Sequence, residues 1–352
     1  MLKKIAILFL SLLTIVLMLA AVACGSESTS SVSENSEKVL VPQRAGMIAR
    51  ISIGSVLADN TIRNAYDEAD KGTDAPTTLD ELLQTSRDKT GLDFTAFKEA
   101  TLFGDINDLS KVTPENGLAA SQGYFGVIIS GTFKNDELIA GIESETGQKL
   151  ESESYNGYKI YTITDTSNSN TNTLALLDES VLVTGSSEAI KDVIDVKNGK
   201  PGLSGDLLAT YENIDGSLGK LALSVPDEWL NQMQDEQDTG ILSTSELEAF
   251  KEMKTISITF DKAGDNTNLE IKAGFSNGAS ANSAKSGIEE LISNLKEFLK
   301  MSEDSSSTPE TAALIDLLDS VRLSISDNWL ILHLELTMDQ VEEITPLLQG
   351  TF

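Results

Sequence analysis

The chain has 352 residues, of which 55 are acidic and 26 are basic, so its formal net charge is −29. So acidic a surface cannot gain affinity for phosphate backbones by releasing counterions, and we therefore expect no nucleic acid among its partners. A single histidine also excludes metal sites built from several histidines.

The first 23 residues have the pattern of a signal peptide. Lys3 and Lys4 precede an apolar tract from Ile5 to Ala23, which is interrupted only by Ser11 and Thr14. About 20 apolar residues also suffice to cross a bilayer, so an uncleaved N-terminal membrane helix is the alternative. Removing residues 1–23 takes away two lysines and no acid, and it changes the formal charge from −29 to −31.

The only cysteine, Cys24, follows this tract directly. The run Ala21-Val22-Ala23-Cys24 resembles the lipobox of bacterial lipoproteins, with Ala21 where leucine is usual. The resemblance implies cleavage after Ala23 and a diacylglyceryl thioether on Cys24, with palmitate-like acyl chains. Two or three acyl chains hold a soluble body on a bilayer, whereas one gives only marginal binding. It also implies export and anchoring to the outer face of a bacterial membrane, either the cell membrane or the outer membrane.

Lipidation of Cys24 would leave the mature chain without a thiol, which excludes disulfides, zinc-cysteine sites and thiol catalysis. Residues 24–45 contain this cysteine and a run rich in serine and glutamate. Such a composition cannot offset the entropy of ordering, so we predict a disordered tether.

Residues 46–216 are predicted to form a first α+β unit. Alternation predicts strands at 47–57, 101–106 and 124–133, and a β meander over 149–185. Helices are predicted at 61–70, 79–89, 94–100 and 136–145, the last capped by Asn135, and a helix capped by Ser186 or Ser187 follows the meander. The dipeptide Asn156-Gly157 predicts a type I′ turn, which requires positive φ at both residues.

Residues 217–352 are predicted to form a second α+β unit. Strands are predicted at 221–225, 255–260, 269–273, 322–326 and 329–336. The strongest helical pattern is the apolar stripe from Ile288 to Leu299, with a capping box at Ser286 and Glu289. Further helices are predicted at 227–237, 246–253, 309–318 and 339–348.

The order of elements is similar in the two units. Both read as strand, helices, two strands, helix, hairpin and helix, which suggests an internal duplication. The alternative is that any α+β chain reads this way at coarse resolution. Hairpin partners dominate in both units, so the predicted fold is α+β with antiparallel sheets backed by helices.

Two segments carry a further resemblance. They are Tyr155-Asn-Gly-Tyr-Lys-Ile-Tyr161 and Gly185-Ser-Ser-Glu-Ala-Ile-Lys-Asp-Val-Ile-Asp195. With the order of elements around them, they resemble a family of exported bacterial proteins that has no assigned function. The resemblance implies no catalytic residues.

The sequence offers few candidates for chemistry. His333 lies on a strand pattern beside Glu335, where a surface or half-buried pair is the expected role. Nucleophile elbows and phosphate-binding loops are absent from the sequence. Two acidic turn clusters, Asp261 to Glu270 and Asp105 to Asp108, lack the ligand order of a calcium-binding EF-hand loop, and we interpret them as solvated turns.

We therefore predict a membrane-anchored envelope lipoprotein with a non-catalytic binding or structural role and with neither cofactor nor metal. Its predicted partners are the membrane, through acyl chains on Cys24, and a protein or apolar ligand that the sequence does not identify. The alternative function is a carrier of a lipid or another apolar ligand. The one residue with an assigned chemical role is Cys24, as the site of lipidation.

Overall fold

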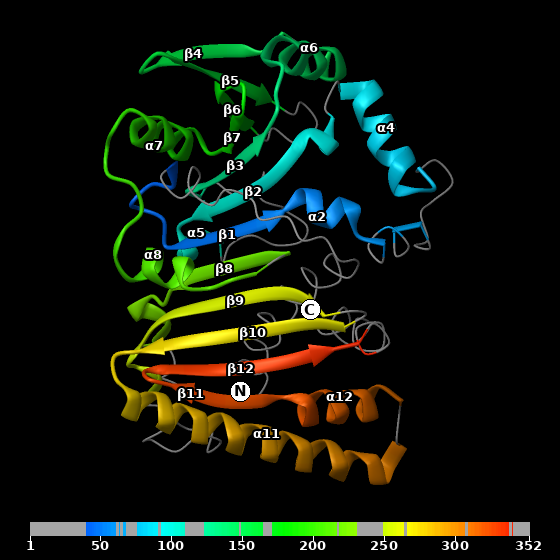
Figure 1. The fold of residues 1–352 in the computed structure, drawn as a ribbon, viewed down its shortest axis with the longest axis vertical. Coiled ribbons are helices and arrows are strands. Elements are labelled where there is room, and N and C mark those ends of the chain that lie inside the picture. Colours follow the sequence, from blue (N-terminus) through cyan, green and yellow to red (C-terminus); the bar gives the residue numbers. More distant parts are fainter. Residues whose placement is uncertain are drawn as a thin grey trace. The chain divides into compact units, whose positions relative to one another are not determined.

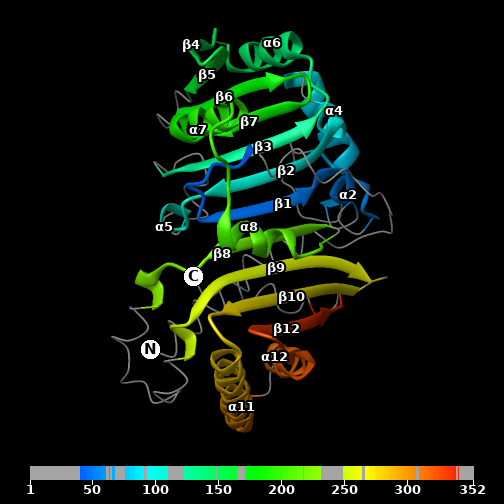
Figure 2. The same ribbon diagram turned by 60° about the vertical axis from the view of Figure 1, so that its left-hand side comes forward.

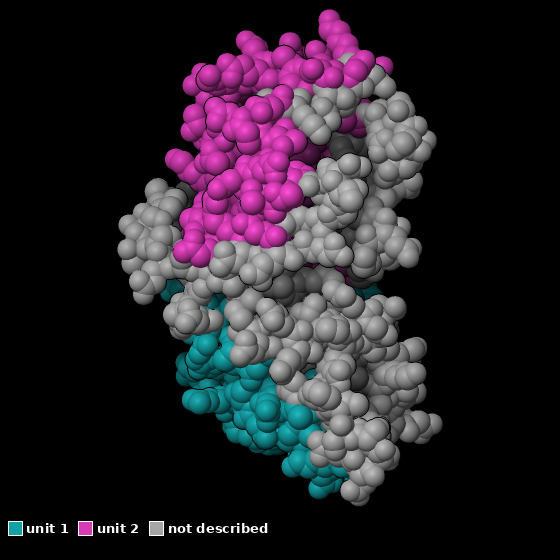
Figure 3. Space-filling view, turned by 90° about the vertical axis from the view of Figure 1, so that its right-hand side faces the viewer, with its two compact units in different colours: residues 1–27, 213–352 teal, residues 28–212 magenta. Residues whose placement is uncertain are grey.

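The computed structural model describes residues 40–60, 63, 66–67, 76–90, 93–109, 123–147, 149–164, 171–216, 218–230, 249–263, 266–306, 309–337 and 340. The chain divides into two compact units (Figure 3). We call residues 28–212 the N-terminal unit and residues 213–352 the C-terminal unit. The sequence predicted this boundary between residues 216 and 217.

The N-terminal unit has an antiparallel sheet with strand order β1-β2-β3-β7-β6-β5-β4 (Figure 1). Its strands are β1 Met47–Ser52, β2 Phe97–Gly104, β3 Phe125–Gly131, β4 Glu151–Tyr155, β5 Tyr158–Thr164, β6 Thr171–Asp178 and β7 Val181–Gly185. Its helices are α2 Ile53–Ala58, α4 Leu79–Thr90, the 3-10 helix η2 Phe94–Ala96, α5 Ile106–Leu109, α6 Asn135–Thr146, α7 Ser187–Lys197 and α8 Gly205–Glu212.

Helices cover both faces of this sheet. On one face α6 contributes Leu138 to a cluster with Leu174 and Leu182. On the other face α7 crosses β3, β5, β6 and β7 and buries Ile190 and Val193 (Figures 1 and 2). The middle strands of this unit are therefore core on both sides.

One contact in this sheet requires glycine. Gly126 and Gly185 are register partners on β3 and β7, and the buried ring of Phe103 lies against Gly126. A Cβ atom at Gly126 would come within 2.4 Å of that ring. The absence of side chains here lets the aromatic ring fill the space above the backbone.

The C-terminal unit has an antiparallel sheet with strand order β8-β9-β10-β12-β11 (Figure 1). Its strands are β8 Gly219–Ser224, β9 Met253–Ala263, β10 Asn266–Phe275, β11 Arg322–Ser326 and β12 Trp329–Leu336, and its long helices are α11 Gly278–Ser306 and α12 Pro309–Ser320. Alternate residues such as Ile258, Leu269 and Leu334 form its core with Leu317 of α12. Mixed α+β structure with antiparallel sheets, as predicted, is confirmed.

The sequence predicted both hairpins that depend on local turn chemistry. Asn156 and Gly157 have φ values of 48° and 91°, as a type I′ turn requires. Strands β11 and β12 coincide with the predicted residues 322–326 and 329–336. Asp327, which lies between them, takes a positive φ of 54°.

Two predicted boundaries in the N-terminal unit are wrong. Residues 53–57 were predicted as strand but belong to α2, because the chain leaves the sheet after Ser52, the last partner of β2. The helix predicted over 94–100 stops at Ala96. Phe97 instead begins β2. The centroid of its ring lies 5.1 Å from that of Phe94 and 5.5 Å from that of Phe133.

Two predicted helix caps are also wrong. Asn135 is the first residue of α6, and Lys134 takes the N-cap position without a side-chain cap. Ser286 lies inside α11, where its hydroxyl donates to the Asn282 carbonyl. The cap of that helix lies nine residues earlier than predicted, at Asn277, which accepts from the Ser280 N–H at 3.0 Å.

Some predictions fall partly or wholly outside the described residues. They are the signal peptide, Cys24 and most of the tether, and the helices at 61–70, 227–237, 246–253 and 339–348. The end of the predicted tether, residues 40–45, is described and is ordered: Leu40 and Val41 are buried, and the Val41 carbonyl accepts from the Leu203 N–H at 2.7 Å. Among the helices that are described, none combines the length and apolar character needed to cross a membrane.

Candidate functional site

Cys24, the residue with a predicted chemical role, precedes the first described residue, Leu40. The structure therefore places no partner beside it. The best developed polar cluster in the described chain lies elsewhere, on α7.

Helix α7 begins where the Ser186 hydroxyl accepts from the Ala189 N–H, as the sequence predicted. Its apolar side is buried, and a second stripe carries Glu188, Asp192 and Asp195 at spacings of four and three residues. These spacings place the three carboxylates on one face of the helix. Each carboxylate reaches a different segment of the N-terminal unit.

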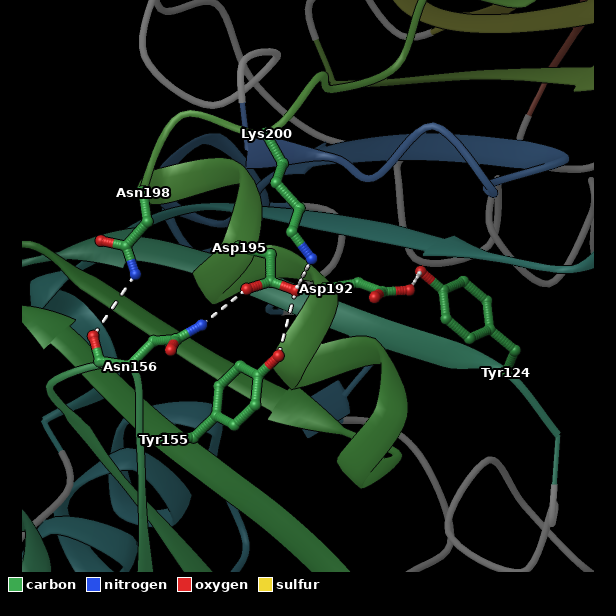
Figure 4. Close-up of polar contacts among 7 residues, drawn as sticks. All are labelled: Tyr124, Tyr155, Asn156, Asp192, Asp195, Asn198 and Lys200. Atoms are coloured by element: carbon green, nitrogen blue, oxygen red, sulfur yellow. Dashed lines mark hydrogen bonds and ion pairs between the residues drawn. The ribbon is translucent and has the colours of Figure 1, made fainter.

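Asp195 is the centre of this cluster and is only 5% exposed (Figure 4). Its Oδ1 accepts from Asn156 Nδ2 at 2.8 Å, and its Oδ2 accepts from the Tyr155 hydroxyl at 3.1 Å and from Lys200 Nζ at 2.6 Å. The Asn198 amide also donates to the Asn156 carbonyl at 3.3 Å. The cluster thus joins the turn between β4 and β5 to the end of α7.

The ionisation of these groups follows from their contacts. The hydrogen bond from Lys200 is the main cause that lowers the pKa of the Asp195 carboxyl, with further lowering from Tyr155 and Asn156. The same carboxylate raises the pKa of both Lys200 and Tyr155. Asp195 and Lys200 are therefore held as an ion pair, and Tyr155 is held as a hydrogen-bond donor.

A second branch of the stripe reaches β3 and the segment before β1. The Tyr124 hydroxyl donates to Asp192 Oδ2 at 2.9 Å (Figure 4), and Arg44 lies 4.2 Å above the Tyr124 ring while pairing with Glu188. Burial, and next the bond to Asp192, raise the pKa of Tyr124. This tyrosine is therefore neither a base nor a nucleophile at neutral pH.

The contacts of the α7 cluster indicate that it stabilises the fold. Asp195 accepts from three different side chains, and its pKa is depressed, so it is a poor general base. Tyrosines with raised pKa values are poor nucleophiles. We conclude that the cluster fastens the β4–β5 hairpin and the post-helix segment to α7.

Sequence reasoning missed this cluster because its members lie as far apart as Tyr124 and Lys200. The available signal was the acidic stripe on α7, opposite Ile190 and Val193. An aspartate at position 195, directly beside a buried face, predicts a partner for its charge. It does not indicate which partner.

The two acidic segments were interpreted as turns, but Asn107 and Asp108 belong to α5, and Asp261 and Glu270 lie on β9 and β10. The Asp105 carboxylate accepts from the Asn107 N–H at 2.9 Å, which caps α5. On β10, Glu270 pairs with Lys272 at 2.8 Å, and Asp265 lies outside the described residues. The described residues contain no group of three or more acidic, histidine or cysteine side chains placed to hold a metal.

His333 lies beside a polar groove in the C-terminal unit. Cross-strand pairs place Lys220, Thr259, Glu270, His333 and Arg322 in one row across all five strands. At its β12–β11 end this row borders a groove of about 290 Å³. The groove is lined by polar side chains: Asn266, Asp319, Ser320, Arg322, His333, Glu335, Thr337 and Gln340.

Comparison of structures adds two crystal structures of TP0453. Crystal form I has a TM-score of 0.42 and 10% sequence identity, over 92% of this chain and 99% of the other. Crystal form III has a TM-score of 0.44 and 8% identity, over 90% of this chain and 100% of the other. No curated protein matches the sequence.

Residues 121–313 match the model of a family described as "protein of unknown function (DUF3352)". The match extends from Ser121, before β3, to Ala313 in α12 and covers more than half of the chain. It includes the whole of α7 and the hairpin that α7 fastens. The resemblance to a family without an assigned function is thereby confirmed, and the chain belongs to the DUF3352 family of proteins of unknown function.

Proposed function

We propose that this protein is an envelope lipoprotein, exported by its signal peptide and held on the outer face of a bacterial membrane by acyl chains on Cys24. The observation that carries the proposal is the apolar tract ending in Ala21-Val22-Ala23-Cys24. The mature body has a non-catalytic role, as a binding or structural protein at the membrane surface.

The charge of the chain supports attachment through the anchor alone. Anionic headgroups repel a body of formal charge −31, so the sheets and helices gain nothing from lying on the bilayer. A flexible run of the length of residues 25–37 has a root-mean-square span of roughly 20 Å. The predicted tether would hold the body clear of the headgroups and leave its surfaces open to a partner.

The use of polar groups in the N-terminal unit supports a binding or structural role. The carboxylates of the α7 cluster are paired with side chains of the same unit, which stiffens the unit. The oxygens of Asp195 already accept from Tyr155, Asn156 and Lys200, so they do not face a substrate. A stiff unit whose α7 carboxylates are paired within the fold suits the presentation of a surface.

The alternative, a carrier of apolar ligands, requires an apolar cavity. The groove beside His333 is lined by charged and polar side chains and suits an apolar ligand poorly. No observation on the described residues favours the carrier.

The anchor is tested by replacing Cys24 in the native host. In the native chain we expect incorporation of labelled palmitate, processing after Ala23 and sedimentation with membranes. The variant Cys24→Ser is expected to lose the label and the processing, whereas the tether variant Ser36→Ala behaves as the native chain.

An uncleaved N-terminal helix gives a different result. In that case Cys24→Ser sediments with membranes at native length, and the native chain carries no label. This result would overturn the proposal.

A further inference from the structure

The groove in the C-terminal unit has the properties of a small binding site. It lies where β11, β12 and the start of β10 meet the end of α12. Its volume of about 290 Å³ is at the lower end of the range of ligand pockets, which is roughly 300–1,000 Å³. A groove of this size and polarity suits a small polar molecule.

The two acidic side chains of the groove already have donors. Glu335 Oε1 accepts from Asn266 Nδ2 at 2.6 Å. Asp319 Oδ1 accepts from Lys296 Nζ of α11 at 2.5 Å. Glu270, the β10 neighbour of His333 in the row, pairs with Lys272.

The guanidinium of Arg322 and the imidazole of His333, which also line the groove, differ from these acids. Among the described residues, neither makes a hydrogen bond or an ion pair with another side chain. They are register partners on β11 and β12, so both project from the same face with Cβ atoms about 5 Å apart. The groove thus offers an open guanidinium and an open imidazole side by side.

We propose that this groove binds a small molecule through an oxyanion, a carboxylate or a phosphate, held by Arg322 and His333. The planar guanidinium of Arg322 matches two oxygens of such a group, and the His333 ring adds one N–H donor. The carboxylates of Glu335 and Asp319, which already accept hydrogen bonds from Asn266 and Lys296, would repel a second negative group on the ligand. This inference goes beyond the proposed function and does not depend on lipidation of Cys24.

The local charge makes an anion site possible on this acidic protein. Lys296 and Lys300 of α11 both act on Asp319, the first through its hydrogen bond and the second through space. With Arg322, which lines the same groove, they place three positive charges near the Asp319 side of the groove. An oxyanion there meets less repulsion than it would elsewhere on a chain of net charge −29.

The single histidine allows a direct test in the purified chain. Labelling with ¹³C-histidine gives one imidazole signal, which is followed at pH 7 while acetate, inorganic phosphate or neutral acetamide is added. We expect a saturable shift with acetate or phosphate and none with acetamide. The more effective anion identifies the oxyanion class of the ligand.

Variants of Arg322 tie the shift to the groove. Arg322→Gln should weaken binding about tenfold to a hundredfold, the loss expected for a charge-assisted hydrogen bond. Arg322→Lys keeps the charge without the planar fork and should lose less. The control Arg87→Gln, on α4 of the other unit, should bind as the native chain does.

Either of two results would overturn the proposal. One is a shift that grows linearly with anion concentration without saturating. The other is an unchanged affinity in Arg322→Gln, whose folding is checked by its melting temperature.

Discussion

In the N-terminal unit the first three strands, β1, β2 and β3, are followed across the sheet by β7 and β6, and the hairpin β5–β4 extends the edge. In the C-terminal unit β8, β9 and β10 are followed by β12 and β11 in the same way. In each unit the last strand in chain order therefore lies beside the third strand in chain order: β7 beside β3, and β12 beside β10. The duplication suggested by the sequence predicts this correspondence of order, and it stays a prediction because common topology does not by itself show common descent.

The units differ in what they do with polar side chains. In the N-terminal unit the acids of α7 accept hydrogen bonds from Tyr124, Tyr155 and Lys200, so these charges stabilise the fold. In the groove of the C-terminal unit, Arg322 and His333 make no hydrogen bond or ion pair with the side chain of another described residue. Similar sheets can thus carry a closed polar cluster in one unit and an open one in the other.

The largest expected difference concerns the glycines beneath aromatic rings. Gly126→Ala drives a methyl group to within 2.4 Å of Phe103, which is fully buried, and should cost about 3 kcal/mol of unfolding free energy. Gly274→Ala comes within 2.8 Å of the Trp329 ring, which is only half-buried and can move, and of the Oγ1 atom of buried Thr255. Its cost should be about 1 kcal/mol. Urea unfolding measures both, and equal costs would contradict the packing described.

The next effect is the loss of the charge at the α7 cluster. Asp195→Asn removes the negative charge that pairs with Lys200. It also replaces one acceptor oxygen by an amide N–H donor, which faces either Asn156 or the pair Tyr155 and Lys200, so the unfolding free energy should fall by about 2 kcal/mol. Asp206→Asn, an exposed acid at the start of α8, should change it by less than about 0.5 kcal/mol. If the two variants unfold alike, the cluster does not stabilise the unit.

The pH dependence of that loss follows from the depressed pKa of Asp195. Its contribution is fully present above the ordinary aspartate value of 3.8 and is lost as the pH falls from there through the lower folded value. The stability difference between the native chain and Asp195→Asn should therefore shrink below pH 4. Urea titrations at pH 7, 4 and 3 measure it, and a difference that grows with acid would contradict the assignment.

The smallest expected effect on stability is at the open groove. Arg322 is exposed and makes no ion pair with a described residue, so Arg322→Gln should change the unfolding free energy by less than about 0.5 kcal/mol. The same variant should lose oxyanion binding. A large destabilisation would show that Arg322 serves the fold, as Asp195 does.

Local signals accounted for the parts of the fold that could be predicted from the sequence. Asn156-Gly157 specifies its turn through backbone φ, and the alternation after Trp329 specifies a strand. Helix α8 was missed because eight residues with only Leu207, Thr210 and Tyr211 buried give a weak periodic signal. The extent of α11 was misjudged because buried Ala281 and Ala284 are too small to stand out.

The polar sites could be predicted only in part. His333 was correctly placed on a strand beside Glu335, but the groove also needs Arg322 from the neighbouring strand and Asp319 from α12. Their proximity depends on strand order and helix packing, which no single segment encodes. The same holds for Lys200 and Asp195, whose partners Tyr155 and Asn156 come from a distant hairpin.

The central claim is that Cys24 attaches the body to a membrane, and intact-mass analysis of the protein from its native membrane tests it most directly. We predict a chain that begins at Cys24, lacks residues 1–23 and carries the added mass of a diacylglyceryl group, with or without a third acyl chain. A chain that keeps residues 1–23 with Cys24 unmodified would contradict it.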